Sequence, residues 1–375
     1  MSHQYDMIYI MKKIALIYDC IYPYQLGGAE KRIYALSKYL KKDFEVHVIG
    51  MHKIGLEKEF EKNKIYYHTL NNYSEIYNKK GKRKILLSIH FAISLFFFLL
   101  KNDYDIIDAT ANPFFHIFSI KLITTIKRKT KVIITWHEYW DKDYWIKYSS
   151  KLTGILGFTI QNLALYLSEN IVSVSQFTKK RIAKKTNKKV YVISNGIEDI
   201  KIKREHKLYD LVYAGRIIDF KNIDKILNLS YLNKNLKTLI IGSGPESERY
   251  KEKYKNKNIE FAGFVKKEID VYKKIAQSRI FMMLSSREGF SIVTLEAMNI
   301  GLPVVCFNGK DNAAKDLIEN NKNGILTDLK TTNIENSIDI IFQNYENYSK
   351  NARKTSYNYL YKNIYKDYFK LINSL

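Results

Sequence analysis

The sequence predicts an α/β protein with two doubly wound parallel sheets, each in a domain of its own. The chain has 375 residues, which is more than one hydrophobic core usually holds. Apolar runs of strand length alternate with stretches of helical periodicity, and this order is typical of parallel strands joined by helices. The alternation begins again near residue 211, after a charged stretch, so we expect two domains rather than one.

The first half of the chain holds the elements of the first sheet. Its first strand candidate, residues 13–19, precedes a glycine-bearing loop and a helical stretch at residues 29–42. The later candidates are apolar runs, most of them followed by helical stretches, at residues 45–50, 65–69, 105–109, 132–137, 170–175 and 190–196. We therefore expect a first domain over residues 1–198.

The second half repeats the pattern after a linker. Residues 197–208 are charged and lack an apolar period, as an interdomain linker should. The strand candidates that follow lie at residues 211–216, 236–242, 259–265, 279–285, 303–308 and 324–329. They predict a second domain over residues 199–350, and we expect residues 351–375 to form a helical tail that packs back on the first domain. Ligands of such Rossmann-like sheets bind beyond the carboxyl ends of the strands, so a cleft between the two domains is the expected site.

The composition favours a globular cytoplasmic protein and leaves its partner open. Lys and Arg exceed Asp and Glu by 24, and such a positive field attracts nucleic acids, acidic membranes and phosphorylated molecules alike. The abundant Ile, Lys, Asn and Tyr are also what an AT-rich genome encodes. Cys20 and Cys306 lie far apart in strand-like runs, which excludes a disulfide framework and gives no zinc-ligand spacing. Residues 1–10 lack the features of a cleavable signal peptide.

One segment raises the question of membrane contact. Residues 85–100 form an apolar run of 16 residues, which is shorter than the roughly 20 residues that a spanning helix needs. Five cations precede it within residues 79–84. Two interpretations stay open: residues 79–100 associate peripherally with the anionic inner face of the cell membrane, or they form a buried core helix with a solvated basic lead-in.

Residues suited to an anionic ligand follow the strand candidates of the second half. Arg216 ends the 211–216 run and Lys221 follows it by five residues, where cations beside free helix N–H groups suit a diphosphate. Taken alone, the favoured interpretation of the pair is two solvated cations. Gly242 and Gly244 follow the next candidate, and Gly263 repeats the theme. These glycines mark either tight turns or positions where backbone amides approach a ligand closely.

The segment from residue 279 to 307 carries two carboxylates around a helix start. Glu288 lies in the loop before a helix that begins near Ser291, and Glu296 lies within the first two turns of that helix. Carboxylates accept paired hydrogen bonds from hydroxyl groups. We therefore expect one of the two to contact a sugar ring and the other a ribose of the same extended ligand.

Six motifs together resemble the retaining GT-B glycosyltransferases of family 4, also described as glycosyl transferases group 1. They are GGAEKRIYALSKYL, SNGIE, YAGRIIDFKN, IIGSGPE, IEFAGFV and REGFSIVTLEAM, and they extend over essentially the whole chain. The resemblance implies the GT-B fold, with two Rossmann-like domains that face a central cleft. It also implies an enzyme that moves a hexose from a UDP- or GDP-linked sugar to an acceptor hydroxyl with retained configuration, without a metal or other cofactor.

The resemblance assigns roles to individual residues. It implies that Arg216 and Lys221 neutralise the donor diphosphate, that Glu288 contacts the transferred sugar and that Glu296 binds the ribose hydroxyls. His137, at the end of the 132–137 run, matches a histidine that hydrogen-bonds the reacting sugar. From the sequence alone, a strand-end histidine without a ligand is the favoured interpretation of that residue.

The remaining donor contacts implied by the resemblance are backbone contacts. Gly27 and Gly28 match a loop that contacts the donor phosphates and the acceptor side, and the amides of Phe290, Ser291 and Ile292 match groups that face sugar and phosphate oxygens. Position 291 is commonly glycine in this family, so the serine either hinders close approach slightly or adds a contact to the donor.

Aromatic residues surround His137, and Glu138 follows it where the family usually has aspartate. The cluster is either a platform on which an acceptor stacks or ordinary core, and it consists of Trp136, Tyr139, Trp140, Tyr144 and Trp145. We expect the acceptor to be a glycan or a polyprenyl-phosphate-linked glycan. The alternatives are another GT-B enzyme, such as a nucleotide-sugar epimerase, and a basic nucleic-acid-binding protein. Because no nucleic-acid-binding signature accompanies the charge, we expect no nucleic-acid partner.

Overall fold

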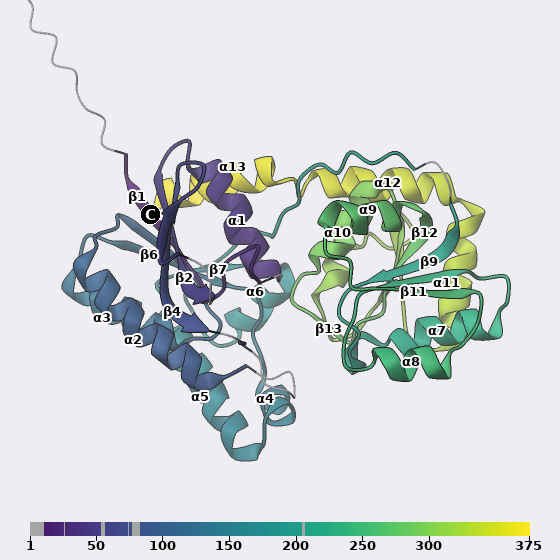
Figure 1. The fold of residues 1–375 in the computed structure, drawn as a ribbon, viewed down its shortest axis with the longest axis horizontal. Helices are drawn as coiled ribbons and strands as arrows, with labels where there is room; N and C mark the ends of the chain where they lie inside the picture. The colour runs from purple at the N-terminus through teal and green to yellow at the C-terminus, as the bar shows by residue number, and fades with distance from the viewer. Residues whose placement is uncertain (1–10, 26, 54–56, 74, 77–82, 205–206) are drawn as a thin grey trace, which may run out of the picture. The chain divides into compact units, whose positions relative to one another are not determined.

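The computed structural model describes residues 11–25, 27–53, 57–73, 75–76, 83–204 and 207–375. The chain forms two compact units, and Figure 1 shows the elements of each. Unit 1 comprises Met1–Val174, Thr178–Ile193 and Tyr365–Leu375, and unit 2 comprises Ser175–Phe177 and Ser194–Ile364. The chain therefore returns to unit 1 for its last residues.

Unit 1 is built on an eight-stranded sheet with the strand order β3-β4-β2-β1-β5-β6-β7-β8. All its neighbouring strands run parallel except β3, which pairs antiparallel with β4 at the edge. The inner strands are almost continuously buried, because helices cover both faces of a parallel sheet. The strands are β1 (Lys13–Ile17), β2 (Glu45–Lys53), β3 (Glu59–Glu61), β4 (Ile65–Tyr73), β5 (Ile106–Thr110), β6 (Lys131–Trp136), β7 (Asn170–Ser173) and β8 (Val190–Val192).

Helices connect these strands. They are α1 (Gly28–Leu40), α2 (Ile85–Lys101), α3 (Phe115–Ile126), α4 (Lys142–Tyr148), α5 (Lys151–Leu167) and α6 (Gln176–Ala183). Figure 1 shows α2, α3 and α5 side by side, and α3 packs against both α2 and α5. Two glycines of α5 let α4 pack closely: a Cβ on Gly154 would lie 2.6 Å from the backbone of Ile146, and one on Gly157 would lie 2.6 Å from the Trp145 ring.

Unit 2 is built on a six-stranded parallel sheet with the order β11-β10-β9-β12-β14-β16. Its strands are β9 (Tyr209–Ala214), β10 (Thr238–Ile241), β11 (Ile259–Gly263), β12 (Ser278–Met283), β14 (Val304–Phe307) and β16 (Gly324–Thr327). A separate two-stranded sheet joins β13 (Arg287–Glu288) to β15 (Asp311–Asn312). Because β9 is the first strand of this sheet and its neighbours β10 and β12 lie on opposite sides, the strand order reverses at β9.

The helices of unit 2 follow its strands in alternation. They are η1 (Asp219–Lys221), α7 (Ile223–Leu232), α8 (Ser247–Lys253), α9 (Glu268–Ala276), α10 (Ile292–Ile300), η2 (Ala313–Leu317), α11 (Thr331–Gln343) and α12 (Tyr345–Tyr357), and the chain ends with α13 (Tyr361–Ser374). α12 and α13 cover most of residues 351–375, the segment predicted as a helical tail. The described part of the predicted linker, residues 197–208, contains neither a helix nor a strand before residue 209.

The structure differs from the sequence prediction at several strands. The strand predicted over residues 190–196 ends at Val192, because the chain leaves the sheet at an edge where β7 is the only neighbour. Three short strands, β3, β13 and β15, were not predicted, since runs of two or three residues carry no readable alternation. Among the described residues, no helix combines the length and the hydropathy needed to cross a membrane.

A buried hydrogen-bond network ties the last helix to the sheet of unit 1. The Tyr368 hydroxyl of α13 donates to Asp108 Oδ2 at 2.5 Å, and the Thr135 hydroxyl donates to Asp108 Oδ1 at 2.8 Å. Burial raises the pKa of Asp108, and the two hydroxyl donors oppose that shift. Closer to the surface, Tyr365 donates to Asp43. The two contacts of α13 therefore differ mainly in burial.

We predict that Tyr368→Phe lowers the free energy of unfolding by about 1–3 kcal/mol, because it leaves a buried carboxylate oxygen without its donor. Urea denaturation of the full chain measures this change. Tyr365→Phe removes the same atom from the more exposed contact and serves as the matched control, with a smaller expected loss. Equal losses for the two variants would contradict a special role for the buried network.

Candidate active site

The predicted site residues fall into two groups. Gly27, Gly28 and His137 belong to unit 1, and the others belong to unit 2. In unit 2 they follow β9, β10, β11 and β12, whose carboxyl ends lie at one edge of the sheet because the strands are parallel. The sheet topology thus brings the unit 2 residues to the edge where ligands of such sheets bind.

An ion pair joins two segments of this edge. Lys221 Nζ lies 2.5 Å from Glu288 Oε1, and the side chains are only 17% and 14% exposed. Lys221 ends η1 after β9, whereas Glu288 lies in β13 after β12. A mostly buried pair of this kind is costly to break from one side, because the remaining charge is left without its partner.

Asn222 fixes the loop that carries Lys221. Its backbone is left-handed, with φ of +51°, and it precedes the first residue of α7. Asn adopts this conformation more easily than most residues because its short side chain bonds locally. The Asn222 side-chain amide donates to the Leu284 carbonyl at 2.7 Å and to the Ser286 hydroxyl at 2.8 Å. The loop after β9 is therefore attached to the segment after β12.

Arg216 lies in the same loop and is exposed. Within the part of the chain that the structure describes, no side chain forms a hydrogen bond or an ion pair with its guanidinium, and only its carbonyl accepts a bond, from the Tyr213 hydroxyl at 3.0 Å. A guanidinium offers five donors in a fork that suits phosphate oxygens. Arg216 is thus available to an anion at the strand ends.

The glycines after β10 allow two loops to touch. A Cβ on Gly242 would lie 1.9 Å from the Gly215 carbonyl oxygen, and one on Gly244 would lie 2.1 Å from the Ile217 carbonyl oxygen. These glycines therefore bring the backbone around Arg216 against the loop after β10. Gly263 has φ of +67°, and a Cβ added there would meet open space. Glycine is therefore favoured at this position by its backbone conformation and not by a lack of room for a side chain.

The start of α10 is a strained turn. Phe290 is buried, and Ser291 precedes the helix with φ of +76° and ψ of 80°, a left-handed conformation that non-glycine residues rarely adopt. The Ser291 hydroxyl lies 2.8 Å from the Thr294 hydroxyl, so the two side chains bond to each other and the Ser291 side chain does not cap a backbone amide of the helix. The open amides from Ile292 onward begin the helix, and such amides suit an anion.

Glu296 is buried in the second turn of α10, where Tyr272 of α9 holds it. The Tyr272 hydroxyl donates to Glu296 Oε1 at 2.9 Å. Burial and the neighbouring carboxylates raise the pKa of Tyr272 strongly, so its hydroxyl remains a donor. This contact orients the Glu296 carboxylate.

In unit 1, His137 follows β6. The residue is partly exposed, yet its Nε2 atom is buried and has no hydrogen-bond partner among the described residues. Burial, together with the nearby Arg32, lowers the pKa of His137 from 6.5 to about 3. The imidazole is therefore neutral at physiological pH, and it can form one further hydrogen bond through Nε2.

Gly27 and Gly28 begin α1 beside a buried carboxylate. A Cβ on Gly27 would lie 2.4 Å from Glu30 Oε2, so the absence of a side chain makes room for Glu30. Burial raises the pKa of Glu30, with a further contribution from Asp19, and the backbone amide of Glu30 opposes the shift. The glycine pair thus packs against an acidic group at the helix start.

The aromatic residues after His137 divide into two sets. Trp136 and Tyr139 are buried, whereas Trp140, Tyr144 and Trp145 are half-buried on and beside α4. The second set also includes Tyr148, which the sequence analysis missed, and its rings lie close together, with the Trp140 and Tyr148 centroids 5.0 Å apart. Trp136 and Tyr139 are therefore ordinary core. The interpretation as a platform for an acceptor stays a prediction for the half-buried rings.

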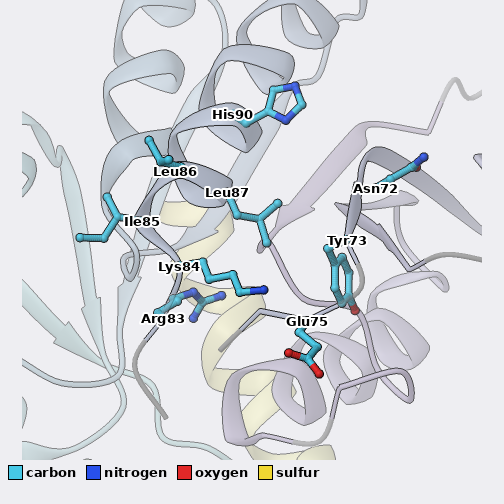
Figure 2. A pocket seen from close by; sticks show the side chains of 9 residues that line it. All are labelled: Asn72, Tyr73, Glu75, Arg83, Lys84, Ile85, Leu86, Leu87 and His90. Carbon is cyan, nitrogen blue, oxygen red and sulfur yellow. The ribbon is translucent and has the colours of Figure 1, made fainter. Parts of the chain in front are cut away.

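Unit 1 also contains a cavity of about 670 Å³ at the N-terminus of α2. Figure 2 shows the Lys84 side chain extending toward Tyr73 and Glu75 from the turn that precedes the helix. The other lining residues are Asn72, Arg83, Ile85, Leu86, Leu87 and His90. Arg83 also forms an ion pair with the buried Asp19. The wall of the cavity is thus partly cationic and partly apolar, while residues 79–82 of the basic run lie outside the described residues.

Two family models match successive parts of the chain. The model described as Glycosyltransferase Family 4 matches residues 26–200, and the model described as Glycosyl transferases group 1 matches residues 196–358. The chain is also similar to solved structures: Anabaena HepE, solved in complex with UDP-glucose, has 16% identity and a TM-score of 0.73, with 97% of this chain and 100% of that chain covered. The chain thus has the GT-B fold, and two successive parts of it match two glycosyltransferase families. The likeness to HepE concerns the fold.

Curated relatives match the chain over part of its length. An uncharacterized glycosyltransferase of Haemophilus influenzae is 32% identical over 155 residues, which cover 39% of this chain and 42% of the relative. The Escherichia coli O-antigen biosynthesis glycosyltransferase WbnH is 24% identical over 192 residues, which cover 49% of this chain and 53% of the relative. The chain thus spans about half the length of the first curated relatives it matches.

Tyr272 and Glu30, which lie against predicted site residues of unit 2 and of unit 1 respectively, carried no signal in the sequence. Tyr272 lies 24 residues before its partner Glu296 and on another helix, so no local spacing relates the two. Glu30 lies in the first predicted helix, where the pattern does not distinguish a buried carboxylate from a solvated one. Only the steric demand at Gly27, visible in three dimensions, links Glu30 to the glycine loop.

The shifted pKa of His137 predicts a pH dependence of stability. Below pH 6.5 the unfolded chain binds a proton at this histidine, whereas the folded protein binds it only below about pH 3. The free energy of unfolding therefore rises with pH through this window. We expect a contribution of at most about 1.4 kcal/mol per pH unit. The window runs from about pH 3 to 6.5. His137→Gln should therefore make the free energy of unfolding depend less on pH over most of the range from pH 4 to 7, as measured by urea denaturation. The exposed His90 supplies the control, His90→Gln, and equal slopes for the two variants would refute the assignment.

The strained turn before α10 predicts an unusual ranking of substitutions. Ser291→Gly and Ser291→Ala both remove the hydroxyl, but only glycine adopts φ of +76° without a steric penalty. We expect the glycine variant to be more stable than the alanine variant by about 1 kcal/mol, measured by thermal or urea unfolding. A more stable alanine variant would show that the turn is relaxed.

Proposed function

We propose that this protein is a glycosyltransferase that moves a hexose from a UDP- or GDP-linked sugar to an acceptor hydroxyl with retained configuration and without a metal ion. The observation that carries the proposal is the Lys221–Glu288 pair at the edge where the strands of unit 2 end, beside the exposed Arg216. This arrangement offers cations for a diphosphate and a carboxylate for sugar hydroxyls within one loop cluster.

In the proposed reaction, the bond between the anomeric carbon and the phosphate oxygen breaks, and a bond to the acceptor oxygen forms on the same face. Negative charge grows on the departing nucleoside diphosphate as the bond breaks. Arg216 and Lys221 stabilise that charge, which is the role that a divalent metal plays in other enzymes. The acceptor proton passes to the departing phosphate oxygen. Glu288 binds the transferred sugar, and its contact with Lys221 keeps the carboxylate beside the cation.

The other residues position the donor. We assign the ribose hydroxyls to Glu296, which Tyr272 orients at 2.9 Å, and a hydroxyl of the reacting sugar to the neutral His137. The amides at the start of α10 and the loops at Gly242 and Gly263 surround the donor in this proposal, and Gly27 and Gly28 contact its phosphates. A neutral imidazole with one buried nitrogen free among the described residues suits a hydrogen bond to an uncharged hydroxyl.

The acceptor is a glycan or a polyprenyl-phosphate-linked glycan at the cytoplasmic face of the membrane. WbnH, to which the chain is similar, is named for O-antigen biosynthesis, and the HepE structure contains a UDP-sugar, so both names support this choice of donor and acceptor class. The half-buried rings of α4 offer a surface on which a sugar stacks.

The proposal predicts that Lys221→Ala and Arg216→Ala each lower turnover by about 100- to 1000-fold, because each removes a group that stabilises the leaving diphosphate. A panel of UDP-, GDP- and ADP-sugars is first tested for thermal stabilisation of the protein. The stabilising donor is then incubated with lipid-linked glycan acceptors, and the product is detected by mass spectrometry.

Lys257→Ala is the matched control, since Lys257 is an exposed lysine of unit 2 away from the strand ends that carry the site. Near-normal turnover in the Lys221 and Arg216 variants would overturn the proposed mechanism. Conversion of the donor sugar without transfer would instead identify an epimerase. Full turnover after dialysis against a metal chelator supports the metal-independent reaction, and loss that added metal restores would contradict it.

A further inference from the structure

We propose that the outer faces of α2, α3 and α5 form one docking surface for an anionic lipid bilayer. We call this surface the three-helix face. It extends well beyond the apolar run at residues 85–100, and it concerns where unit 1 binds rather than which reaction the protein catalyses.

The face begins with α2, which is apolar on both its buried side and its exposed side. Its inner side is buried through Phe91, Leu95 and Leu99, yet its outer side is also apolar. Leu86 is 81% exposed and Phe97 is 57% exposed, although both are large apolar side chains. One side of the helix is therefore core, and the other side faces outward.

The neighbouring helices continue the apolar surface. On α3, Leu122 and Ile126 are exposed one turn apart. On α5, Leu152, Leu156 and Leu163 are exposed along one stripe, because they are separated by four and seven residues. Figure 1 shows the three helices side by side, and α3 packs against both α2 and α5, so the outer faces of the three helices adjoin. A contiguous exposed apolar patch of this kind marks an interaction site.

The charge of the face selects an anionic partner. None of the described residues of α2, α3 and α5 is Asp or Glu, whereas Lys101 and Lys151 lie on these helices and are exposed. Lys121 of α3 is already paired with Glu169. Lys84 immediately precedes α2, and Arg128 follows α3 by two residues; both are exposed. Apolar side chains flanked by cations fit the acyl and headgroup layers of an anionic leaflet. A second copy docked through the same face would instead bring like charges together.

The aromatic residues of α4 extend this pattern. α4 packs against α5, and Trp140, which precedes α4, bonds through its backbone to Gln161 of α5. The half-buried Trp140 ring lies against Tyr144 and Tyr148 of α4. Rings with an apolar body and a polar edge are favoured at the boundary between hydrocarbon and water. Since no described helix is long and apolar enough to cross a membrane, the face lies on the bilayer rather than through it.

Flotation of the full chain with vesicles tests this inference without donor or acceptor, so its failure is independent of the proposed chemistry. We expect the protein to float with vesicles of equimolar phosphatidylcholine and phosphatidylglycerol, and to float much less with phosphatidylcholine alone. Added salt should weaken the interaction with the anionic vesicles. Absence of the wild-type protein from the anionic vesicles would overturn the proposal.

Two variants locate the surface. The apolar variant carries Ile93→Ser, Phe97→Ser, Leu156→Ser and Leu163→Ser, and we expect its vesicle partition to fall by about tenfold or more. The matched control carries Leu232→Ser and Ile269→Ser, which remove exposed apolar side chains from unit 2 and should leave partition unchanged. An equal effect of the two sets would contradict the three-helix face.

A charge variant keeps the test decisive if the apolar variant misfolds. Lys101→Glu and Lys151→Glu alter only exposed side chains, and together they should abolish the preference for phosphatidylglycerol. Circular dichroism checks the fold of each variant. Sedimentation velocity without lipid tests the alternative occupant: a dimer that the apolar variant converts to a monomer, with no vesicle binding by the wild type, would show that a second copy covers the face.

Discussion

The ion pair between Lys221 and Glu288 is the constraint on which the unit 2 site depends. It joins the loop after β9 to the short strand after β12, and at 2.5 Å with both side chains mostly buried it leaves little freedom to either segment. A charge in such surroundings needs its partner, so the two segments hold one relative position. The Asn222 side chain reinforces this position through two hydrogen bonds to the segment after β12. The Arg216 guanidinium is then presented from a loop that is fixed on both sides.

Backbone conformation contributes as much to this site as side-chain chemistry does. Asn222 and Ser291 both adopt left-handed conformations directly before helices, at φ of +51° and +76°. Gly242 and Gly244 permit contacts that any Cβ would prevent. Residues in rarely populated conformations persist only where the surrounding structure holds them, and they concentrate at functional sites. Here they bring the amides of α10, the loop after β10 and the Arg216 loop to one sheet edge.

The sequence could predict the parts of the site that lie next to strand ends. Arg216, Lys221 and Glu288 follow apolar runs directly, so the pattern of parallel strands already places them at one edge. It could not predict Tyr272, which reaches Glu296 from another helix, nor the contact between Asp108 and Tyr368, which are 260 residues apart. The outer faces of α3 and α5 were missed for a different reason. Apolar periodicity identifies a helix, but it does not show that a second apolar side remains uncovered.

Two groups of cations, which account for part of the positive charge, differ in how their interactions depend on distance and salt. At the unit 2 site, Lys221 is mostly buried and already faces a carboxylate, so its interactions act at short range and salt screens them weakly. On the three-helix face, Lys101 and Lys151 are exposed beside apolar side chains and without acidic neighbours on their own helices. Their attraction to an anionic surface acts over a Debye length and is screened accordingly. Ionic strength therefore separates the two proposals: we expect added salt to weaken the proposed contact of unit 1 with an anionic surface well before it weakens the proposed binding of a diphosphate by unit 2.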